Sequence, residues 1–555
     1  MEQGRVLIAI ALSFVVFIGW NFFFVEKPEV KQQQPAELAA SAAEQKLHPG
    51  SSPGVPAEKS TDAFVQPEQM TSKDIAEART ITVATPLYTV RLSEDGAILK
   101  SFKLENYREQ AHKNAAKKEL IEPENNGQNL KMSFSGNSLA GLETAVFDAD
   151  ALEDTIHVTR GTRTVTFTWQ SESGVVIEKR FSFSPETYLI DMNLVVKNGS
   201  MGGFTDSVTV EIQKQYGQKN GGYAFEGPSA LLDGKLEQVK IKKIEDKNAL
   251  RGSFGWIALE DRYFMRSLIP AESADGLMKL AVRGERLVVS KLQRPERVFH
   301  AGETVSYDYK IFFGPKRMAL LNNLGFDLGK AVQFGMFSII AKPLLWFMNL
   351  IYSVIPNYGV AIILLTIVTK ILLWPLGNKS YKSMNEMKKI QPLMAELREK
   401  YKNDKKQMNQ ELMALYKTYK INPMGGCLPM VLQIPVFFAL YRMLYQAIEL
   451  RHTPFMFWIN DLSAPDRLFN FDITIPFMQP PFGIPVLTLV MGATMFLQQK
   501  MSPPPGDPTQ AKMMMLMPVV FTFIFINFSS GLVLYWLVNN VLSIGQQYYI
   551  QKKFA

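Results

Sequence analysis

The sequence is poor in the residues that most enzymes and metalloproteins use. It holds one cysteine, Cys427, so no disulfide can form within the chain, and its five histidines are scattered without metal-ligand spacing. It contains neither a GxxxxGK[ST] phosphate loop nor a GxSxG nucleophile elbow. These absences exclude a disulfide scaffold and give no support to nucleotide or ester hydrolysis. We therefore expect no catalytic residue, no metal and no cofactor.

Acidic residues are in the minority, and the formal net charge is +8. Such an excess is compatible with nucleic-acid binding, but here the basic residues cluster beside long apolar runs. That arrangement is typical of membrane topology signals. We therefore expect a lipid bilayer as partner and no specific nucleic-acid sequence.

The N-terminal part consists of two stretches of opposite character. Residues 1–25 contain an apolar run of about twenty residues, enough to span a bilayer. The alternative is a cleaved signal peptide, but the run exceeds the usual apolar region and no small-residue cleavage site follows closely. Residues 26–79 are rich in Gln, Pro, Ala and Ser and have too few apolar residues to bury. We predict a retained transmembrane anchor followed by a disordered periplasmic tether.

Residues 80–315 have the pattern of a water-soluble β-domain. In TVTFTW, apolar Val165, Phe167 and Trp169 alternate with threonines, and a second alternation runs from Tyr188 to Val196. The turn clusters SEDG, SESG and KNGS separate these strands, which predicts a large β-sandwich. A sugar-processing enzyme is one reading. With no suggestive carboxylate or histidine pair, a binding or spacer domain is favoured.

The last part of the chain is predicted to be an all-α polytopic core. Residues 316–357 form a connecting segment with an amphipathic, proline-containing helix, for which a position in the membrane interface fits better than a span. The core, residues 358–550, contains five apolar stretches at 358–376, 424–445, 484–499, 513–528 and 531–550. With the anchor, this makes six membrane helices beside a large all-β domain.

The charges between these helices predict their orientation. Residues 377–422 hold eleven Lys or Arg against five Asp or Glu, whereas residues 448–483 hold two against four. Short loops rich in Lys and Arg stay in the cytoplasm. The β-domain is therefore expected outside and both termini inside.

Residues 377–422 are polar but carry two apolar heptad seams, separated at Asn403–Asp404. The seams consist of Met387, Ile390, Met394, Leu397, Tyr401, Met408, Leu412, Leu415 and Tyr419. Two antiparallel helices would bury these seams against each other. The functional hypothesis is that this hairpin docks other proteins, because methionine suits varied apolar partners. The predicted docking surface consists of Met387, Met394, Leu397, Met408 and Leu412. Pro392 is expected to kink the first helix.

Polar residues inside the predicted spans are the candidates for function. Lys370 lies in the apolar run VAIILLTIVTKILLWPL, where a charge costs about 2.5–3.5 kcal/mol on insertion scales. It could snorkel to the headgroups or line a polar groove. Gln433, between two prolines, could instead pair with backbone groups that those prolines leave free.

Long irregular motifs in this region, NPMGGCLPMVLQIPVFFALYRML, FWINDLSAPD, FLQQKMSPPPGDPTQAKMM and SSGLVLYW, resemble the YidC membrane protein insertases of Gram-negative inner membranes. The likeness is dense over residues 330–550 and extends to the anchor and the β-domain. It implies a hydrophilic groove open to cytoplasm and lipid, with a cation that attracts the polar tail of an incoming protein.

The resemblance also implies roles for individual residues. The family's groove cation aligns with Lys370, although the family usually has arginine there. Its substrate-contacting threonine aligns with Thr366, and a groove glutamine with Gln433. Tyr535 and Trp536 stand where the family has substrate-contacting aromatics, with tryptophan in place of a second tyrosine.

The expected function is that of an insertase and membrane chaperone in the bacterial inner membrane, not of an enzyme. The resemblance implies nascent membrane proteins as clients, the Sec translocon as an occasional partner, and ribosomes at the cytoplasmic loops. One rival is a secondary transporter, but no internal repeat with paired broken helices is seen. Another is a membrane-tethered periplasmic carbohydrate-binding protein or enzyme.

Overall fold

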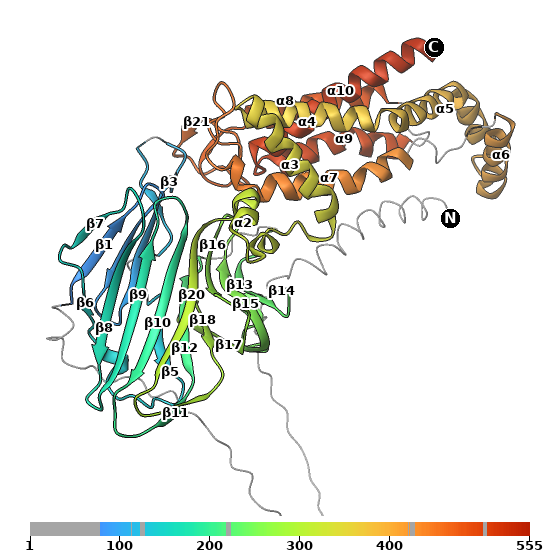
Figure 1. The fold of residues 1–555 in the computed structure, drawn as a ribbon. Helices are drawn as coiled ribbons and strands as arrows, with labels where there is room; N and C mark the ends of the chain where they lie inside the picture. Colours follow the sequence, from blue (N-terminus) through green and yellow to red (C-terminus); the bar gives the residue numbers. More distant parts are fainter. Residues whose placement is uncertain are drawn as a thin grey trace, which may run out of the picture. The chain divides into compact units, whose positions relative to one another are not determined.

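The computed structural model describes residues 78–112, 114–121, 128–217, 224–419, 421, 428–502 and 508–554, which belong to one compact unit. The predicted anchor (1–25) and nearly all of the predicted tether (26–79) lie outside these residues. Strands occupy the β-domain, residues 80–315, and helices dominate the helical region, residues 318–554 (Figure 1).

The β-domain contains two principal sheets. A five-stranded sheet has the order β4-β3-β2-β1-β7, and a thirteen-stranded sheet has the order β5-β12-β18-β17-β15-β16-β20-β10-β9-β8-β6, with β13 and β14 beside β15. The first is built from β1 (Thr80–Ala84), β2 (Tyr88–Ser93), β3 (Ile98–Arg108), β4 (Lys117–Glu119) and β7 (Thr155–His157). The second is built from β5 (Lys131–Phe134), β6 (Asp148–Ala149), β8 (Arg163–Gln170), β9 (Val175–Phe183), β10 (Leu189–Asn198), β12 (Val208–Gln215), β13 (Gly227–Leu232), β14 (Lys235–Gln238), β15 (Ala249–Glu260), β16 (Phe264–Pro270), β17 (Ala274–Arg283), β18 (Leu287–Gln293) and β20 (Thr304–Pro315). A short pair, β11 (Phe204–Asp206) and β19 (Arg297–Phe299), completes the domain.

The strands show the predicted alternation of buried and exposed side chains. Val165 and Phe167 of β8 are buried, and in β10 the buried residues again occur at every second position. The turn Ser171–Gly174 joins β8 to β9, and Ser171 Oγ accepts a hydrogen bond from the backbone N–H of Val175 at 2.9 Å. The predicted β-sandwich is thus confirmed.

Aromatic side chains fill the space between the two sheets. Phe102 of β3 lies 5.5 Å from Phe313 of β20, measured between ring centroids. Tyr88 of β2 lies 6.4 Å from Tyr188, which directly precedes β10. Each such ring buries a large apolar area, so these contacts hold the sheets face to face.

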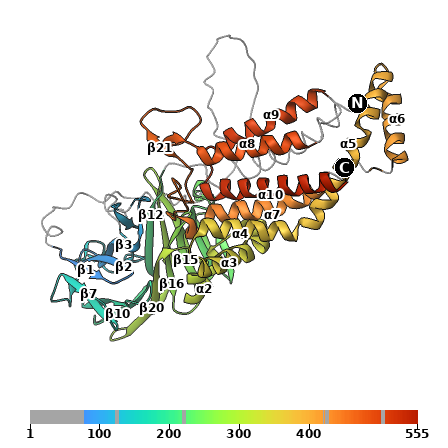
Figure 2. The ribbon, with the colours of Figure 1, turned by 90° about the horizontal axis from the view of Figure 1, so that it is seen from above.

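The helical region follows the β-domain without a long linker. Its helices are α2 (Met318–Leu324), α3 (Ser338–Val354), α4 (Tyr358–Leu372), α5 (Trp374–Lys400), α6 (Lys405–Thr418), α7 (Leu428–Gln446), α8 (Val486–Met501), α9 (Pro508–Phe525) and α10 (Ser530–Phe554). Helix α10 packs against α4, α5, α7 and α8; α9 packs on α8, and α3 on α4 and α7. Figure 2 shows α10 running alongside α4 and α7.

The segment predicted as an interfacial helix forms α3, which continues through Pro343 as one helix. Together with a preceding 3-10 turn it spans Gly335–Val354. By length and composition it is the one straight helix of the described residues that could cross a bilayer. The interfacial position of this helix stays a prediction.

The first predicted core span, 358–376, is bent. Helix α4 ends at Leu372, and α5 begins at Trp374 at an angle of 65°. Pro375 lies in the first turn of α5, where its missing N–H leaves no helical hydrogen bond unmade. The bend brings Lys370 into the last turn of α4 rather than mid-span.

Helices α5 and α6 form the predicted antiparallel hairpin. The Asp404 carboxylate caps α6 by accepting hydrogen bonds from the N–H groups of Lys406 and Gln407, at 3.0 and 2.9 Å. Helix α5 runs through Pro392 without a break. Tyr416, not the predicted Tyr419, packs into the hairpin core, because Tyr419 lies at the frayed end of α6 and is exposed.

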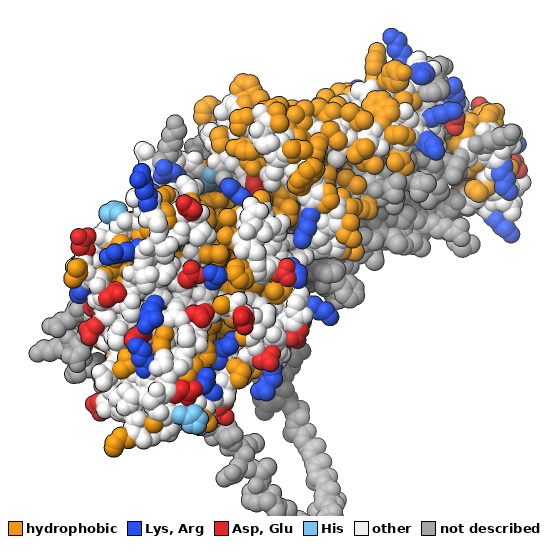
Figure 3. Space-filling view, viewed as in Figure 1, with side chains coloured by type: hydrophobic (Ala, Val, Ile, Leu, Met, Phe, Trp, Pro, Cys, Tyr) orange, Lys and Arg blue, Asp and Glu red, His pale blue; other side chains and the backbone are white. Residues whose placement is uncertain are grey.

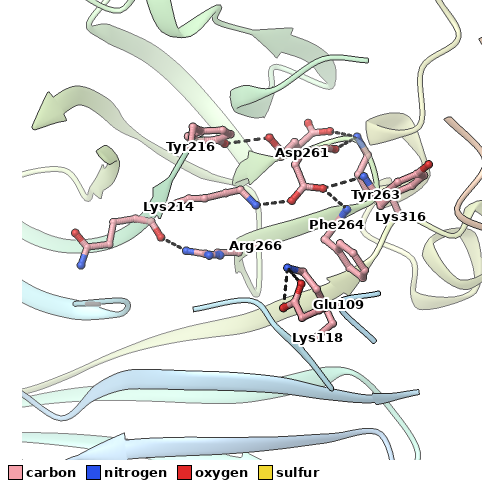
Figure 4. Close-up of polar contacts among 11 residues, drawn as sticks. Glu109, Lys118, Lys214, Tyr216, Asp261, Tyr263, Phe264, Arg266 and Lys316 are labelled. Carbon is pink, nitrogen blue, oxygen red and sulfur yellow. Dashed lines mark hydrogen bonds and ion pairs between the residues drawn. The ribbon is translucent and has the colours of Figure 1, made fainter. Parts of the chain in front are cut away.

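The turn between β15 and β16 fastens the β-domain to α7. Figure 4 shows Lys214 reaching the carboxylate of Asp261. This carboxylate also accepts hydrogen bonds from the backbone N–H groups of Tyr263 and Phe264, at 2.8 and 2.7 Å. The next residue, Arg262, donates to the carbonyl of Tyr445 at 2.7 Å. Its guanidinium also lies 3.7 Å from the centre of the Tyr445 ring. The turn thus positions a cation against the C-terminal end of α7.

Candidate functional site

Lys370 is the charged residue of α4, and its side chain points to α10. Its ammonium donates a hydrogen bond of 2.6 Å to Ser543 Oγ. Ser543 in turn donates to the backbone carbonyl of Asn539 at 2.7 Å. The serine hydroxyl therefore accepts from the lysine while its own proton is held by the α10 backbone, which fixes the direction of the pair.

The charge of Lys370 has no counterion among the described residues. No carboxylate of this part of the chain lies within ion-pair distance of the ammonium. The side chain is half-buried between helices, where water screens a charge less well than at an open surface. An uncompensated cation in such a place attracts a nearby negative group strongly.

Further polar side chains from three helices surround this pair. Tyr381 of α5 lies beside Ser543 of α10 and Gln498 of α8. Gln546 of α10 donates to the carbonyl of Trp374 at 3.2 Å and to Asn378 Oδ1 at 3.0 Å. We call Lys370, Tyr381, Gln498, Ser543 and Gln546 the polar cluster.

The polar cluster contains hydrogen-bonding capacity that the described residues leave unused. Gln546 and its neighbour Gln547 are 1% and 2% exposed, and the Oε1 atom of each has no hydrogen-bond partner in the described part of the chain. An unsatisfied buried polar atom costs about 1–3 kcal/mol. These oxygens are therefore suited to accept hydrogen bonds from water or from a polar ligand.

Tight packing holds the cluster together at the start of α5. A Cβ atom added at Gly377 would lie 2.7 Å from the Nε2 atom of Gln546. Glycine at this position therefore allows α5 to approach α10 closely enough for the Gln546 hydrogen bonds.

Sequence reasoning found Lys370 but missed the rest of the cluster. Asn539, Ser543, Gln546 and Gln547 follow one another at helical spacing along α10, which places them along one side of this helix. That polar stripe in an apolar helix was the available signal. Its link to Lys370, however, joins residues 173 positions apart in the chain.

The predicted groove residue Thr366 is buried one turn before Lys370. Its hydroxyl donates to the carbonyl of Ile362 at 2.6 Å, within the same helix. Its donor is thus satisfied by α4 itself, and only the lone pairs of its oxygen remain to accept a hydrogen bond from a ligand.

The other predicted groove residues lie on α7 and α10. Gln433 is half-buried on α7. Tyr535 is buried, and the ring of its neighbour Trp536 packs edge-on against Phe437 and Phe525, at centroid distances of 4.7 and 4.8 Å. Trp536 therefore belongs to an aromatic cluster between α7, α9 and α10.

The five residues predicted as the docking surface of the hairpin pack within it. Met394 and Leu412 are buried, with Met387, Leu397 and Met408 half-buried against them. The seam is thus the core of the hairpin. The large apolar side chains of the hairpin that remain exposed are Met413 and Tyr419, at 53% and 51%.

Comparison with known proteins adds two family matches. The model of the 60Kd inner membrane protein family matches residues 350–555, and that of the YidC periplasmic domain matches residues 80–347. The boundary between the two matches falls within α3.

Relatives are similar over their full length. The chain is 41% identical to the membrane protein insertase YidC of Syntrophus aciditrophicus, with 99% of each chain covered. It is 39% identical to that of Syntrophobacter fumaroxidans, covering 99% of this chain and 100% of the relative. A crystal structure of an active YidC insertase is matched over 85% of this chain and 92% of that chain, at 18% identity and a TM-score of 0.38.

Proposed function

Because the chain belongs to the YidC family of membrane protein insertases, we propose that Lys370 and the polar cluster receive the polar segment of an incoming membrane protein. The family consists of insertases rather than enzymes, and its members are inner-membrane proteins with a periplasmic domain. Its clients are nascent membrane proteins in the lipid bilayer.

One observation carries the proposal: a half-buried ammonium whose partner in the described residues is a neutral hydroxyl. Lys370 attracts an acidic or polar client tail, and this attraction grows as the local dielectric falls. Glutamine and tyrosine side chains around it supply hydrogen bonds to replace those that the tail gives up in water.

The apolar part of the client provides the driving force. About twenty apolar residues entering lipid at roughly −0.3 to −0.6 kcal/mol each make insertion favourable without a nucleotide. The cluster then lowers the barrier for the polar tail alone. Thr366, Gln433, Tyr535 and Trp536 are the further residues proposed to line the client's path.

Orientation and partners complete the proposal. The charge asymmetry places the α5–α6 hairpin and both termini in the cytoplasm. There the hairpin meets ribosomes, and the insertase works alone or beside the Sec translocon. Cleavage of the hairpin by protease added outside intact spheroplasts would overturn the orientation. Failure of the full-length protein to cross-link to ribosomes or to Sec subunits would remove those partners.

The central test uses two single-span clients that differ only in the charge of the tail. We expect Lys370→Arg to retain insertion and Lys370→Glu to lose it by tenfold or more. Lys370→Gln is expected to be intermediate and worst for the acidic tail, because it keeps hydrogen bonding but removes the charge. Insertion is measured in vesicles at matched protein levels.

A matched control is Lys342→Gln, which removes a lysine from the apolar helix α3, outside the polar cluster. This variant should insert both clients as the unaltered protein does. If Lys370→Gln also inserts both clients equally well, Lys370 is a snorkelling residue and the proposal fails.

A further inference from the structure

A cavity lies between the β-domain and the ends of the membrane helices. Its volume is about 790 Å³. One side is formed by the end of β3 and the turn after it, together with Arg317 before α2. The other side is formed by α3, the start of α4 and residues 448–453 after α7. None of these residues belongs to the polar cluster, so the cavity has no part in the insertion step proposed above.

The floor of the cavity is aromatic and acidic. Tyr188, Tyr358 and Glu449 are buried there, at 7%, 8% and 7% exposure. Tyr358 donates a hydrogen bond of 3.1 Å to Asn349 Oδ1, and its ring stacks on Tyr352 with 3.9 Å between centroids. Tyrosine faces and a carboxylate together form a surface that suits a cation.

One carboxylate oxygen of Glu449, Oε1, has no hydrogen-bond partner in the described part of the chain. Burial raises the pKa of this carboxyl, and the charge of Arg317 and a hydrogen bond from Asn349 offset this only in part. A carboxyl group in this state gains from any ligand that brings a positively charged donor.

The rim of the cavity is basic. Arg108, Arg317 and Arg451 line it. Arg108 donates to the carbonyl of Ala115 at 2.8 Å, and Arg451 to the carbonyl of Arg108 at 2.7 Å, which orients both side chains. Arg317 is exposed to the cavity, and its guanidinium makes no hydrogen bond or ion pair with the residues that the structure describes. Guanidinium groups so placed suit a phosphate.

The two halves of the cavity together specify a ligand. A free phosphate would satisfy the rim alone, and a free amine would satisfy the floor alone. A phosphate and a primary ammonium separated by a short linker would satisfy both. The cavity also lies where α3 ends and α4 begins, and the exposed apolar Val354 and Ile355 follow its lining residue Tyr352. Tyrosines at the ends of apolar helices are typical of the headgroup level of a membrane.

We propose that this cavity binds the headgroup of an aminophospholipid from the periplasmic leaflet, with the phosphate at Arg317 and Arg451 and the ammonium at Glu449. The lipid enters from the side, and its acyl chains lie against the apolar end of α3. A bound lipid of this kind joins the β-domain to the helical region at the membrane surface.

The test is native mass spectrometry of the full-length protein released from nanodiscs that contain phosphatidylethanolamine or phosphatidylglycerol. We expect one retained phosphatidylethanolamine, and Arg317→Ala should weaken its binding about tenfold or more. Glu449→Gln should weaken phosphatidylethanolamine binding but leave phosphatidylglycerol binding unchanged, so that the preference between the lipids is lost. A role in folding alone would not shift this preference.

Arg163→Ala is the matched control, since it removes an exposed arginine of β8 that does not line the cavity. It should bind lipid as the unaltered protein does. Equal lipid retention by Arg317→Ala and the control would overturn the proposal. So would displacement of the lipid by millimolar inorganic phosphate, which would identify the ligand as a soluble anion. Thermal unfolding of each variant shows whether the fold is intact. If Arg317→Ala unfolds, a photo-crosslinker placed at the cavity residue Ala319 of the otherwise unaltered protein should still yield a lipid adduct.

Discussion

The β-domain and the helical region treat buried charge in different ways. In the β-domain two buried charges neutralise each other: Lys316 and Glu260, with side chains 9% and 0% exposed, form an ion pair of 2.7 Å. In the helical region the half-buried ammonium of Lys370 has a serine hydroxyl instead. A paired charge is neutralised within the fold, whereas an unpaired one keeps its field for a ligand. The comparison teaches that the Lys316 charge is neutralised within the fold, whereas the Lys370 charge has a neutral hydroxyl as its partner among the described residues and stays available to a ligand.

The surfaces of the two regions also differ, in how their apolar and charged side chains are distributed. Figure 3 shows hydrophobic side chains gathered over the helices, while Lys, Arg, Asp and Glu are interspersed over the visible face of the β-domain. Leu372 and Phe523 are among the exposed apolar residues of the helices, at 72% and 62%. Such a surface is typical of contact with lipid and not with water. The interspersed charges of the β-domain are instead typical of a surface in contact with water.

The largest expected effect comes from removing each region in turn. We expect deletion of the hairpin, residues 377–422, to abolish insertion while the protein still accumulates in the membrane. Deletion of most of residues 80–315 should leave insertion largely intact, because the polar cluster lies wholly in the helices. The measurement is insertion of a single-span client in vesicles at equal protein levels. A stable protein that lost insertion through the β-domain deletion would reverse the comparison.

A second prediction concerns Lys179, a buried charge of the β-domain that has no carboxylate partner among the described residues. The ammonium of Lys179, 0% exposed, donates to the backbone carbonyls of Ala97 and Leu130, at 2.7 Å each, and to Gly96 at 3.2 Å. We expect Lys179→Met to destabilise the β-domain by about 3 kcal/mol, because it leaves these carbonyls unpaired in the core.

Hydrogen exchange at β9 measures this effect in the full-length protein. Lys247→Met, which removes an exposed lysine of a surface ion pair, is the control and should change exchange little. Insertion by Lys179→Met should persist wherever the helices stay folded. Unchanged exchange at β9 would show that Lys179 carries none of the domain's stability.

The same lysine predicts a pH dependence of stability that is smaller for each pH unit than the effect of Lys179→Met. Burial, together with the nearby charge of Lys131, lowers the pKa of Lys179 to about 7. Between that value and the ordinary pKa near 10.5 the unfolded chain binds more protons than the folded one. The free energy of unfolding should therefore rise with pH across this window, by up to about 1.4 kcal/mol per pH unit. Exchange at β9 should slow accordingly once intrinsic rates are subtracted, and Lys179→Met should lose this slope.

The smallest expected effect is at the partner of Lys370. Ser543→Ala removes one neutral acceptor, which is worth about 0.5–1.5 kcal/mol, but leaves the charge in place. We expect insertion of an acidic-tailed client to change by no more than a few-fold. Ser529→Ala, at the start of α10, is a control of the same chemistry. A loss as complete as that of Lys370→Glu would mean that the hydroxyl, and not the cation, receives the client.

Much of this molecule followed from contiguous sequence. The alternation in β8 and β10 predicted the β-sandwich, and the apolar runs predicted helices at α4, α7, α8, α9 and α10. The heptad seams predicted the hairpin. These patterns arise because a strand repeats every two residues and a helix every 3.6, so each element records in its own residues which face it buries. The charge of the loops and the lone lysine in an apolar run are likewise local properties of the chain.

Other features were decided by the tertiary structure alone. The bend at Leu373 moved Lys370 to the end of its helix, and the packing of α10 brought Ser543 and Gln546 beside it. The hairpin turned Met387, Met394 and Met408 inward, and residues from β3 to the segment after α7 enclosed the cavity. Such pairings join residues far apart in the chain, and their partners depend on how whole helices and sheets pack. No local period encodes that packing, because many partners would bury the same apolar face equally well.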